Sequence, residues 1–501
     1  MKKTTTVFKI SVVLAIIFVL WGALAPHNLQ TVTSSIQGFI QVKFGWFYLI
    51  SATILLIFAI FLIFSKYGNI KLGKDDDEPE YSAISWFAML FSAGMGIGLV
   101  FWGCAEPLSH FSDPPYGDPK TQDAAELALR YSFFHWGLHP WAIYAVIALA
   151  LAYFKFRKGE PGLISATFRP ILGEKVKGWL GKLIDILAVF ATIFGVATSL
   201  GMGAVQINGG LSFISDSIPN STNVQFLIIL VVTVLFMLSA ISGLGRGIKW
   251  LSNANIVFAV LLMLFLLFIG PTNFLLDFFT SQLGTYIENL PKMSLRLTPF
   301  SEKNSAWIQD WTIFYWAWWI SWSPFVGTFI ARISKGRTIR EFVIGVLAVP
   351  TIFSALWFAV FGGAGIHLQI FSHVDLTGLI DKQGYEVALF SVLSHFPMST
   401  LMIVLAILLI TTFFITSADS ATFVLGMQTT NGSLNPQLWI KVVWGIMQAA
   451  AASVLLFSGG LDALQTAAII AAFPFAIILL FMIYSMMKAF KDEKPPKHLR
   501  R

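Results

Sequence analysis

The chain contains few charged residues and a single cysteine, and both shortages limit what it can be. Only 12% of its 501 residues are Asp, Glu, Lys or Arg, about half the fraction of a soluble globular protein. The one cysteine, Cys104, excludes a disulfide within the chain. The net charge of +7 does not indicate nucleic-acid binding, because the basic residues lie in short loops between apolar runs. With 56% hydrophobic residues, the composition indicates a polytopic, all-α membrane protein.

Apolar stretches long enough to cross a bilayer predict about twelve transmembrane helices. They lie near residues 7–25, 46–64, 85–103, 131–153, 183–205, 226–241, 252–270, 311–332, 342–362, 400–426, 439–457 and 464–484. Of the 33 Lys and Arg residues, 26 fall in the loops on the side of the termini. This bias predicts that both termini are cytoplasmic. The apolar run near the N-terminus lacks a clear small-residue cleavage site, so we interpret it as the first span and not as a removed signal.

Two helix-breaking signals lie five spans apart. The third span contains SAGMGIG at residues 92–98, and each glycine weakens a helix by about 1 kcal/mol. The eighth span contains Ser323 and Pro324, and proline removes a backbone donor. Interrupted helices at matching positions of two halves are typical of inverted repeats with a binding site between them. We therefore expect both helices to be broken; close packing by small residues is the alternative for the glycines.

The predicted breaks and spans give a domain organisation. Residues 274–290 and 384–396 are too polar to span a membrane and are expected to form helices on the external surface. The expected divisions are an N-terminal region with two additional spans (1–82), a first repeat (83–275), an external surface helix (276–306), a second repeat (307–487) and a short basic cytoplasmic tail (488–501).

The eighth span is unusually rich in tryptophan. Trp311, Tyr315, Trp318 and Trp322 fall on one helical stripe, with Trp319 beside it. A lipid-facing span needs no such rings, and interfacial tryptophans lie at the ends of spans. A quaternary ammonium has no N–H to donate, so aromatic faces are its best partners, at about 0.5–2 kcal/mol per ring. The stripe therefore indicates either a site for such a cation or an aromatic core.

The fourth span carries a second aromatic set, Trp136, Trp141 and Tyr144, which project within one sector of a helix. Pro140 is expected to kink this span. His135 and His139 have the i, i+4 spacing of metal ligands. No third ligand is evident, so we interpret both histidines as packing or hydrogen-bonding groups.

The tenth span contains FFITSADSAT at residues 413–422. The hydroxyls of Thr416, Ser417 and Ser420 are oxygen ligands of the kind that a hard cation such as Na⁺ requires. Carbonyls freed at an unwound helix would complete such a site. In the alternative interpretation each hydroxyl donates to a carbonyl of its own helix.

These motifs together resemble the betaine/choline/carnitine transporter (BCCT) family. The similarity is carried by GMGIG (94–98), FHWGLHPWAIY (134–144), WAWWISWSPF (316–325), the basic IARISKGRTIREF (330–342) and TSADS (416–420). It extends over nearly the whole chain and is strongest toward the glycine betaine permeases of Gram-positive bacteria. The resemblance implies a LeuT-type fold with a 5+5 inverted repeat preceded by two extra helices, often assembled as a homotrimer.

The resemblance also implies the residues that bind the substrate. The aromatic cage around trimethylammonium would consist of Trp136, Trp141, Tyr144 and Trp319, with Trp318 and Trp322 in transient contacts. The backbone of Gly94, Met95 and Gly96 would approach the substrate carboxylate, since freed N–H groups suit an anion.

Two Na⁺ sites are implied in the same way. One would use Ser92, Met95, Phe413, Thr416 and Ser417, and the second would use Thr192, Tyr144 and Phe325. Relatives with the second site carry two hydroxyl residues one helical turn apart, whereas the residue four after Thr192 is Val196. A methyl group cannot bind sodium, so Thr198, Ser199 or a backbone carbonyl would have to replace it, or fewer than two ions bind.

The implied function is a Na⁺-coupled symporter that imports glycine betaine by alternating access in response to osmotic stress. Glycine betaine is preferred to choline as the substrate. Choline lacks a carboxylate, and family members that transport it often carry an acid in this segment, whereas GMGIG contains none. The alternatives are an H⁺-coupled or Na⁺-independent transporter of choline, carnitine or another quaternary-ammonium or sulfonium osmolyte, and more distantly a channel. A channel is disfavoured because tight aromatic binding opposes fast conduction.

No enzymatic activity is expected, because Glu106, Asp185 and Asp419 are scattered acids with no paired base evident. No cofactor is expected either, and Na⁺ would be the coupling ion. The expected location is the bacterial cytoplasmic membrane, where the basic tail would contact anionic lipid. A nucleic-acid partner is not expected.

Overall fold

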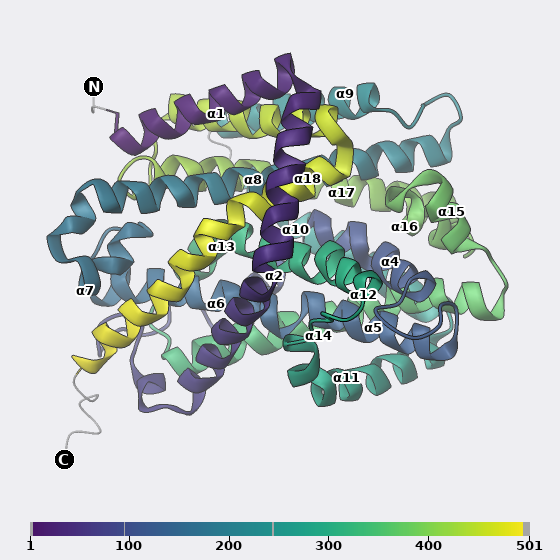
Figure 1. Ribbon diagram of the computed structural model, residues 1–501, viewed down its shortest axis with the longest axis horizontal. Helices are drawn as coiled ribbons and strands as arrows, with labels where there is room; N and C mark the ends of the chain where they lie inside the picture. The colour runs from purple at the N-terminus through teal and green to yellow at the C-terminus, as the bar shows by residue number, and fades with distance from the viewer. Residues whose placement is uncertain (1–3, 95, 243–244, 494–501) are drawn as a thin grey trace.

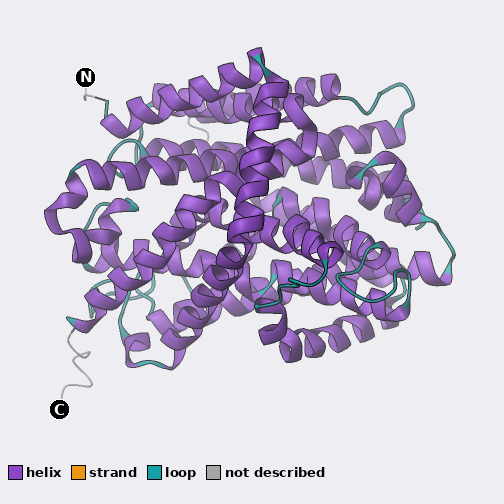
Figure 2. Cartoon of the chain, viewed as in Figure 1, coloured by secondary structure: helices purple, strands orange, loops and turns teal. Residues whose placement is uncertain are grey.

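The structure is a computed structural model that describes residues 4–94, 96–242 and 245–493. Among these residues there is no strand, and a single isolated bridge joins Lys71 to Thr338 (Figure 2). The prediction of an all-α chain is therefore confirmed. Residues 494–501, which make up most of the predicted basic tail, lie outside the described residues.

Eighteen α-helices make up the part of the chain that the structure describes. The longer ones are α1 (Thr6–Leu24), α2 (Pro26–Phe64), α8 (Trp179–Ile214), α9 (Thr222–Ser242), α10 (Gly245–Ile269), α11 (Thr272–Ser294), α13 (Phe314–Ile333), α14 (Ile339–Phe371), α17 (Ser399–Gln428) and α18 (Leu438–Lys491). The shorter ones are α3 (Ala83–Gly94), α4 (Ile97–Ser112), α5 (Gln122–Trp136), α6 (Leu138–Ala152), α7 (Arg169–Leu172), α12 (Glu302–Trp307), α15 (Leu376–Gln383) and α16 (Ala388–Leu393).

The helices account for about twelve membrane crossings, as predicted. Nine helical stretches within the described ranges are long and apolar enough to span a bilayer. One of them, α18, contains non-helical backbone at Gly459 and Gly460 and so holds two crossings. The helix pair α3–α4 and helix α13 supply the remaining two.

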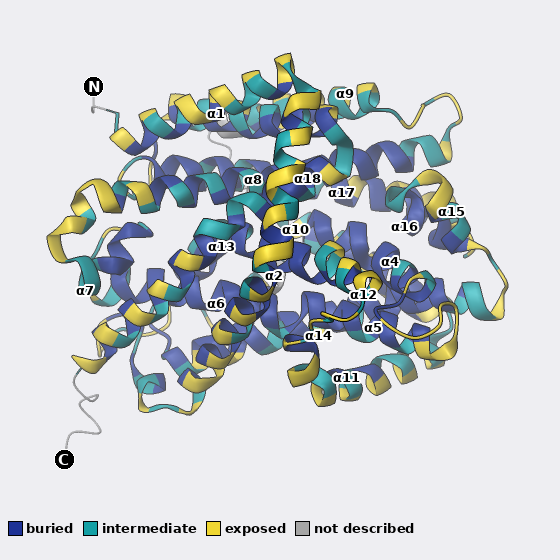
Figure 3. Ribbon diagram, viewed as in Figure 1, coloured by how far each residue is buried: buried dark blue, intermediate teal, exposed yellow. Residues whose placement is uncertain are grey.

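Helices α1 and α2 lie on the outside of the bundle, and α2 crosses its front in the view of Figure 1. Their exposed side chains are mostly apolar, as a lipid-facing surface requires (Figure 3). Helices α4, α5, α6 and α13 are instead almost wholly buried, and α13 packs against α6, α8 and α18. The start of α1 and the end of α18 lie at the same side of the molecule, at the left of Figure 1.

The third span is broken where the glycines predict. Helix α3 ends at Gly94 and α4 begins at Ile97, and Gly96 between them has extended backbone (φ −161°, ψ 178°). Met95 lies outside the described residues. The first turn of a helix leaves its N–H groups without partners in that helix. The break therefore presents backbone donors at the depth of the third span.

The predicted break at Ser323 and Pro324 is wrong, because α13 continues through both residues. Proline cannot donate a hydrogen bond to the carbonyl of Ile320, four residues earlier. The Ser323 hydroxyl donates to that carbonyl instead, at 2.7 Å. Since the freed acceptor is satisfied within the helix, nothing forces the chain to unwind. The irregular turn of this span is a π-helical stretch at Ile308–Ile313, just before α13.

The fourth span is divided at Gly137, which separates α5 from α6 with non-helical backbone (φ −99°, ψ −126°). Pro140 follows in the first turn of α6, where proline is tolerated. The interruption thus lies three residues before the proline that was expected to cause it. The predicted polar segment 274–290 lies within α11, and the segment 384–396 contains a 3₁₀ turn (Tyr385–Val387) followed by α16. The division of the chain into two inverted repeats stays a prediction.

Candidate functional site

Five aromatic rings from α5, α6 and α13 meet around one small chamber. The ring of Trp319 stacks on Trp318 at 4.6 Å between centroids and meets Trp136 edge-on at 4.8 Å. On α6, Trp141 and Tyr144 lie 5.4 Å apart, also edge-on. All five rings are buried. The predicted cage residues are therefore brought together, with their faces and edges turned toward a common space.

Several polar atoms of the cage have no hydrogen-bond partner in the described structure. These atoms are the Tyr144 hydroxyl and the indole nitrogens of Trp318 and Trp322. The indole nitrogen of Trp319 donates to the His135 carbonyl at 2.9 Å, and that of Trp136 donates to Glu106 at 2.7 Å. Two of the cage rings are thus fixed by hydrogen bonds, while the others are held by packing alone.

The chamber between these rings is small. Its volume is about 30 Å³, and Gly96, Ser199 and Ser354 lie on its wall beside the rings. A single water needs about 10–15 Å³ on this measure, so the chamber has room for roughly two waters. A trimethylammonium group is larger than that. Binding therefore requires the rings to separate.

Glycine at position 98 allows α4 to approach the cage. A Cβ atom at Gly98 would lie 2.5 Å from Cη2 of Trp318 and 3.1 Å from Cη2 of Trp136. A Cβ at Gly96 would meet the Trp322 ring at an ordinary 3.6 Å. Gly96 and Gly98 line the chamber, so part of the GMGIG segment lies where a bound substrate would. Gly94 ends α3, and Met95 belongs to the undescribed part of the chain.

A second, much larger cavity of about 670 Å³ lies next to the chamber. Trp322 lines both spaces and so forms the partition between them. The rim of the larger cavity includes the basic side chains of Lys155, Arg332 and Lys441. Ser92, Phe413, Thr416 and Ser417, all predicted for the first Na⁺ site, line this cavity, and so does Phe325.

The tryptophan stripe of the eighth span lines three cavities. Trp311 lines a small outer cavity of about 130 Å³, together with Asp113 and Tyr385. Trp318 lines the small chamber, and Trp322 lines the chamber and the large cavity. Residues of the stripe therefore line three separate cavities, while Tyr315 and Trp318 are also fully buried.

The hydroxyl of Thr416, predicted for the first Na⁺ site, has several polar neighbours. It lies within hydrogen-bond distance of two carbonyls of its own helix, Thr412 at 3.0 Å and Phe413 at 3.2 Å. It also accepts from the side-chain amide of Asn255 at 3.0 Å. One lone pair of Thr416 is then left for a cation. Asn255 was missed by the sequence analysis; its buried Oδ1 has no partner in the described structure.

The second predicted Na⁺ site stays a prediction. Thr192 donates to the Ala188 carbonyl at 2.8 Å and lies 3.3 Å from the side-chain amide of Gln428. Thr198 donates to the Leu464 carbonyl at 2.9 Å. Ser199 lines the small chamber, as Tyr144 does. Of the two candidate substitutes, Ser199 is the one placed near the predicted ligand Tyr144.

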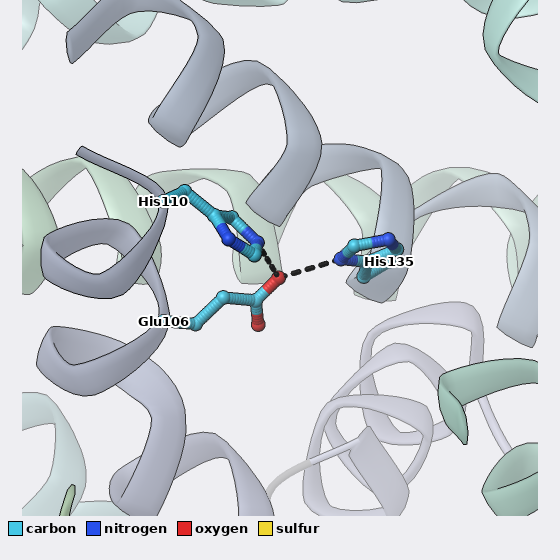
Figure 4. Close-up of side chains that lie close together, drawn as sticks. All are labelled: Glu106, His110 and His135. Atoms are coloured by element: carbon cyan, nitrogen blue, oxygen red, sulfur yellow. Dashed lines mark hydrogen bonds and ion pairs between the residues drawn. The ribbon is translucent and has the colours of Figure 1, made fainter. Parts of the chain in front are cut away.

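A buried cluster behind the cage corrects the sequence analysis. Glu106 was described as an acid without a paired base, but it lies 3.1 Å from Nε2 of His110 and 2.7 Å from Nδ1 of His135 (Figure 4). The side chains of all three residues are fully buried, and their possible ligand atoms lie within 4.8 Å of one another. The i, i+4 spacing of Glu106 and His110 was a signal in the sequence, whereas His135 comes from a different helix.

His139 does not join this cluster, although it follows His135 by four residues. It stacks on Trp316 at 5.0 Å and shares a hydrogen bond with Ser294 at 3.1 Å. His139 thus packs and hydrogen-bonds as expected, whereas His135 lies in a group of three possible metal ligands that the sequence analysis did not foresee.

A membrane-embedded helical bundle with an aromatic chamber at its centre matches a known family. The profile of the betaine/carnitine/choline family transporters (BCCT) matches residues 6–495. The chain belongs to this family. It is 56% identical to the glycine betaine transporter OpuD of Bacillus subtilis, over 99% of this chain and 96% of that protein. It is 47% identical to a probable glycine betaine transporter of Desulfitobacterium hafniense over 99% of both chains. An ectoine/hydroxyectoine transporter of Virgibacillus pantothenticus is 45% identical over 97% of both.

Proposed function

We propose that this BCCT transporter imports glycine betaine together with Na⁺ by alternating access. The observation that carries the proposal is that successive tryptophans of the eighth span line three cavities, with a small aromatic chamber next to the largest of the three. A channel needs a continuous path, whereas a transporter needs a site that is sealed from at least one side. The partition at Trp322 fits the second requirement.

The conformation fits a state that faces the cytoplasm. The large cavity is bordered by Lys155, Arg332 and Lys441, which belong to the loops that the positive-inside rule assigns to the cytoplasm. Both termini would lie on that same side. A small chamber beside a large cavity lined by basic residues is what we expect after release of the substrate toward the cytoplasm.

The chemistry of the chamber favours a quaternary ammonium. The chamber is lined by aromatic rings, glycine and hydroxyl groups, with no charged side chain among its described lining residues. Such a site compensates a cation through ring quadrupoles without requiring an N–H donor from the ligand. The N-terminus of α4 at Gly96 adds backbone donors for a carboxylate. Glycine betaine carries both groups, and two of the relatives above bear its name.

Na⁺ coupling is proposed through the first cation site. Ser92, Thr416 and Ser417 line one cavity, and Thr416 keeps a free lone pair. Joint binding of Na⁺ and substrate would favour closure of the cavity only if both bind more tightly in the closed state. We propose that at least this one ion is transported, and that Val196 weakens or removes the second site.

The remaining proposals concern the environment of the protein. We place it in the cytoplasmic membrane of a bacterium, as a homotrimer whose basic tail contacts anionic lipid, where it supplies an osmoprotectant under osmotic stress. It performs transport without a chemical conversion of the substrate and without an organic cofactor.

The test is uptake of radiolabelled glycine betaine into proteoliposomes. An inward Na⁺ gradient should drive accumulation, whereas matched K⁺ and proton gradients should not. Excess unlabelled ectoine, carnitine and choline would rank the alternative substrates. Thr416→Ala should raise the Na⁺ concentration needed for half-maximal uptake, and the matched variant Thr412→Ala, whose hydroxyl donates to its own helix at 2.8 Å, should not. Uptake that persists without Na⁺ would refute the coupling.

A further inference from the structure

The carboxylate of Glu106 accepts four hydrogen bonds from three segments of the bundle. Oε1 lies 2.7 Å from Nδ1 of His135 and 3.1 Å from Nε2 of His110, and each nitrogen can donate to it in the appropriate tautomer. Oε2 accepts from Nε1 of Trp136 at 2.7 Å and from the hydroxyl of Tyr315 at 2.6 Å. An ionised carboxylate offers about four lone pairs, and here each has a donor.

The donors around Glu106 are compatible with an ionised carboxylate. The indole nitrogen of Trp136 can only donate, so the oxygen facing it cannot itself carry a proton toward it. The Nε2 atom of His135 lies 3.0 Å from the Thr312 hydroxyl, which can accept or donate. We assign Glu106 as a buried anion, with His110 and His135 neutral and donating to it, because this assignment satisfies all four contacts. A metal ion at this cluster would have to displace at least one of them.

Two of the four donors belong to rings that form or support the cage. Trp136 lines the chamber and meets Trp319 at 4.8 Å. Tyr315 stacks on Trp319 at 5.8 Å with an interplanar angle of 22°. Glu106 thus fixes Trp136 directly and supports Trp319 through Tyr315. It does so from outside the chamber, which no charged side chain lines among the described residues.

We propose that Glu106 is a positioning residue that selects a cationic headgroup through Trp136. Its hydrogen bond orients the indole ring, and its negative charge, one ring behind the chamber wall, favours positive charge inside. The same charge disfavours the substrate carboxylate at that end. A zwitterion therefore binds with its ammonium toward Trp136 and its carboxylate toward Gly96, at the start of α4. This inference rests on the proposed function and adds to it the residue that determines charge selectivity.

The test compares two ligands of the same shape. Glycine betaine and 3,3-dimethylbutanoate differ in that carbon replaces the charged nitrogen. Binding of each to the purified protein in saturating Na⁺ is measured by quenching of tryptophan fluorescence. Glu106→Gln preserves the size of the side chain but removes its charge. We expect this variant to bind glycine betaine about tenfold more weakly and to bind dimethylbutanoate with nearly unchanged affinity. The preference for glycine betaine over dimethylbutanoate should therefore fall.

Two variants control for structural effects. Asp185→Asn neutralises another buried carboxylate, which is bonded to Ser165 and lies away from the chamber; it should keep the wild-type preference. Glu106→Asp retains the charge on a shorter side chain. It should weaken the binding of both ligands by the same factor, because Trp136 loses its hydrogen-bond acceptor. The ratio of the two affinities should be preserved.

The possible results separate this inference from the function on which it rests. The role of charge would be overturned if Glu106→Gln weakened the binding of both ligands equally and so left the preference unchanged. It would also be overturned if Glu106→Asp lost the preference. If Glu106→Gln does not fold, loss of the preference in Glu106→Asp would still overturn the role of charge. A wild-type protein that binds neither ligand would overturn the proposed function and this inference with it.

Discussion

Replacing Gly98 with alanine should close the cage against its substrate. The new Cβ would lie 2.5 Å from Cη2 of Trp318, whereas ordinary contact begins at 3.4 Å, so the ring must retreat by about 0.9 Å. Trp318 is held by stacking on Trp319 at 4.6 Å and on Phe314 at 5.6 Å. Any retreat of the ring therefore presses on the rest of the cage.

The magnitude follows from the cost of overpacking a well-packed core, about 1–3 kcal/mol. The chamber already has a volume of only about 30 Å³, and the rings must separate further before trimethylammonium fits. Gly98 lines the chamber, so the added methyl group also occupies space that the substrate needs. A loss of about 1.4 kcal/mol in the bound state weakens binding by about tenfold. We expect Gly98→Ala to raise the dissociation constant of glycine betaine by at least this factor.

The assay is fluorescence-detected binding to purified protein, supported by uptake into proteoliposomes. Gly284→Ala is the matched control, since it changes a glycine in the helix α11 where no atom lies within 4 Å of the new Cβ. Alanine there should leave binding unchanged and add up to about 1 kcal/mol of helix stability. A folded Gly98→Ala protein that binds glycine betaine like the wild type would refute the account of the closed cage.

Three further variants test other parts of the structure. Val196→Thr should restore a hydroxyl one turn after Thr192 and steepen the Na⁺ dependence of uptake; an unchanged Hill coefficient would argue against a second site there. Ser323→Ala should leave the Ile320 carbonyl without its 2.7 Å donor and lower stability by about 1 kcal/mol, measured as the thermal unfolding midpoint; an unchanged midpoint would mean that the carbonyl finds another donor. Burial raises the pKa of Glu493, but hydrogen bonds from Arg157, Lys158 and Tyr153 outweigh it and lower the pKa to about 2. The stabilisation from this residue should therefore be complete above about pH 5 and be lost only as pH falls toward 2. Glu493→Gln should remove it at neutral pH, seen as faster hydrogen exchange at the end of α18, and exchange at the wild-type rate would contradict this role.

Much of the fold follows from local sequence properties. Three signals each concern a single helix or loop: the length of an apolar run, the distribution of Lys and Arg, and the glycines of residues 94–98. They can therefore be interpreted without knowing which helices pack together. The break after Gly94 was predicted for this reason. The break at Pro324 was predicted wrongly because the outcome depended on a single hydroxyl, that of Ser323, and on the rotamer that lets it reach the Ile320 carbonyl.

The residues of the cage were also available from the sequence, since tryptophan at helical spacing inside a membrane span is rare enough to be informative. Their roles as ligands stay predictions. What the spacing could not give is the state of the cage, because the separation of Trp136 from Trp319 depends on how α5 and α13 pack.

The amino-acid order was enough to predict several features, because each depends on a contiguous stretch of chain. These features are the class of the protein, its approximate number of spans, the broken third helix and the aromatic residues of the site. Other features depend on helix packing: Glu106 meets His135, Trp136 and Tyr315, the chamber is small, and Thr198 is turned toward α18. These features require segments far apart in sequence to lie within contact or hydrogen-bond distance. Such distances are set by how the helices pack together, which no single stretch of sequence specifies.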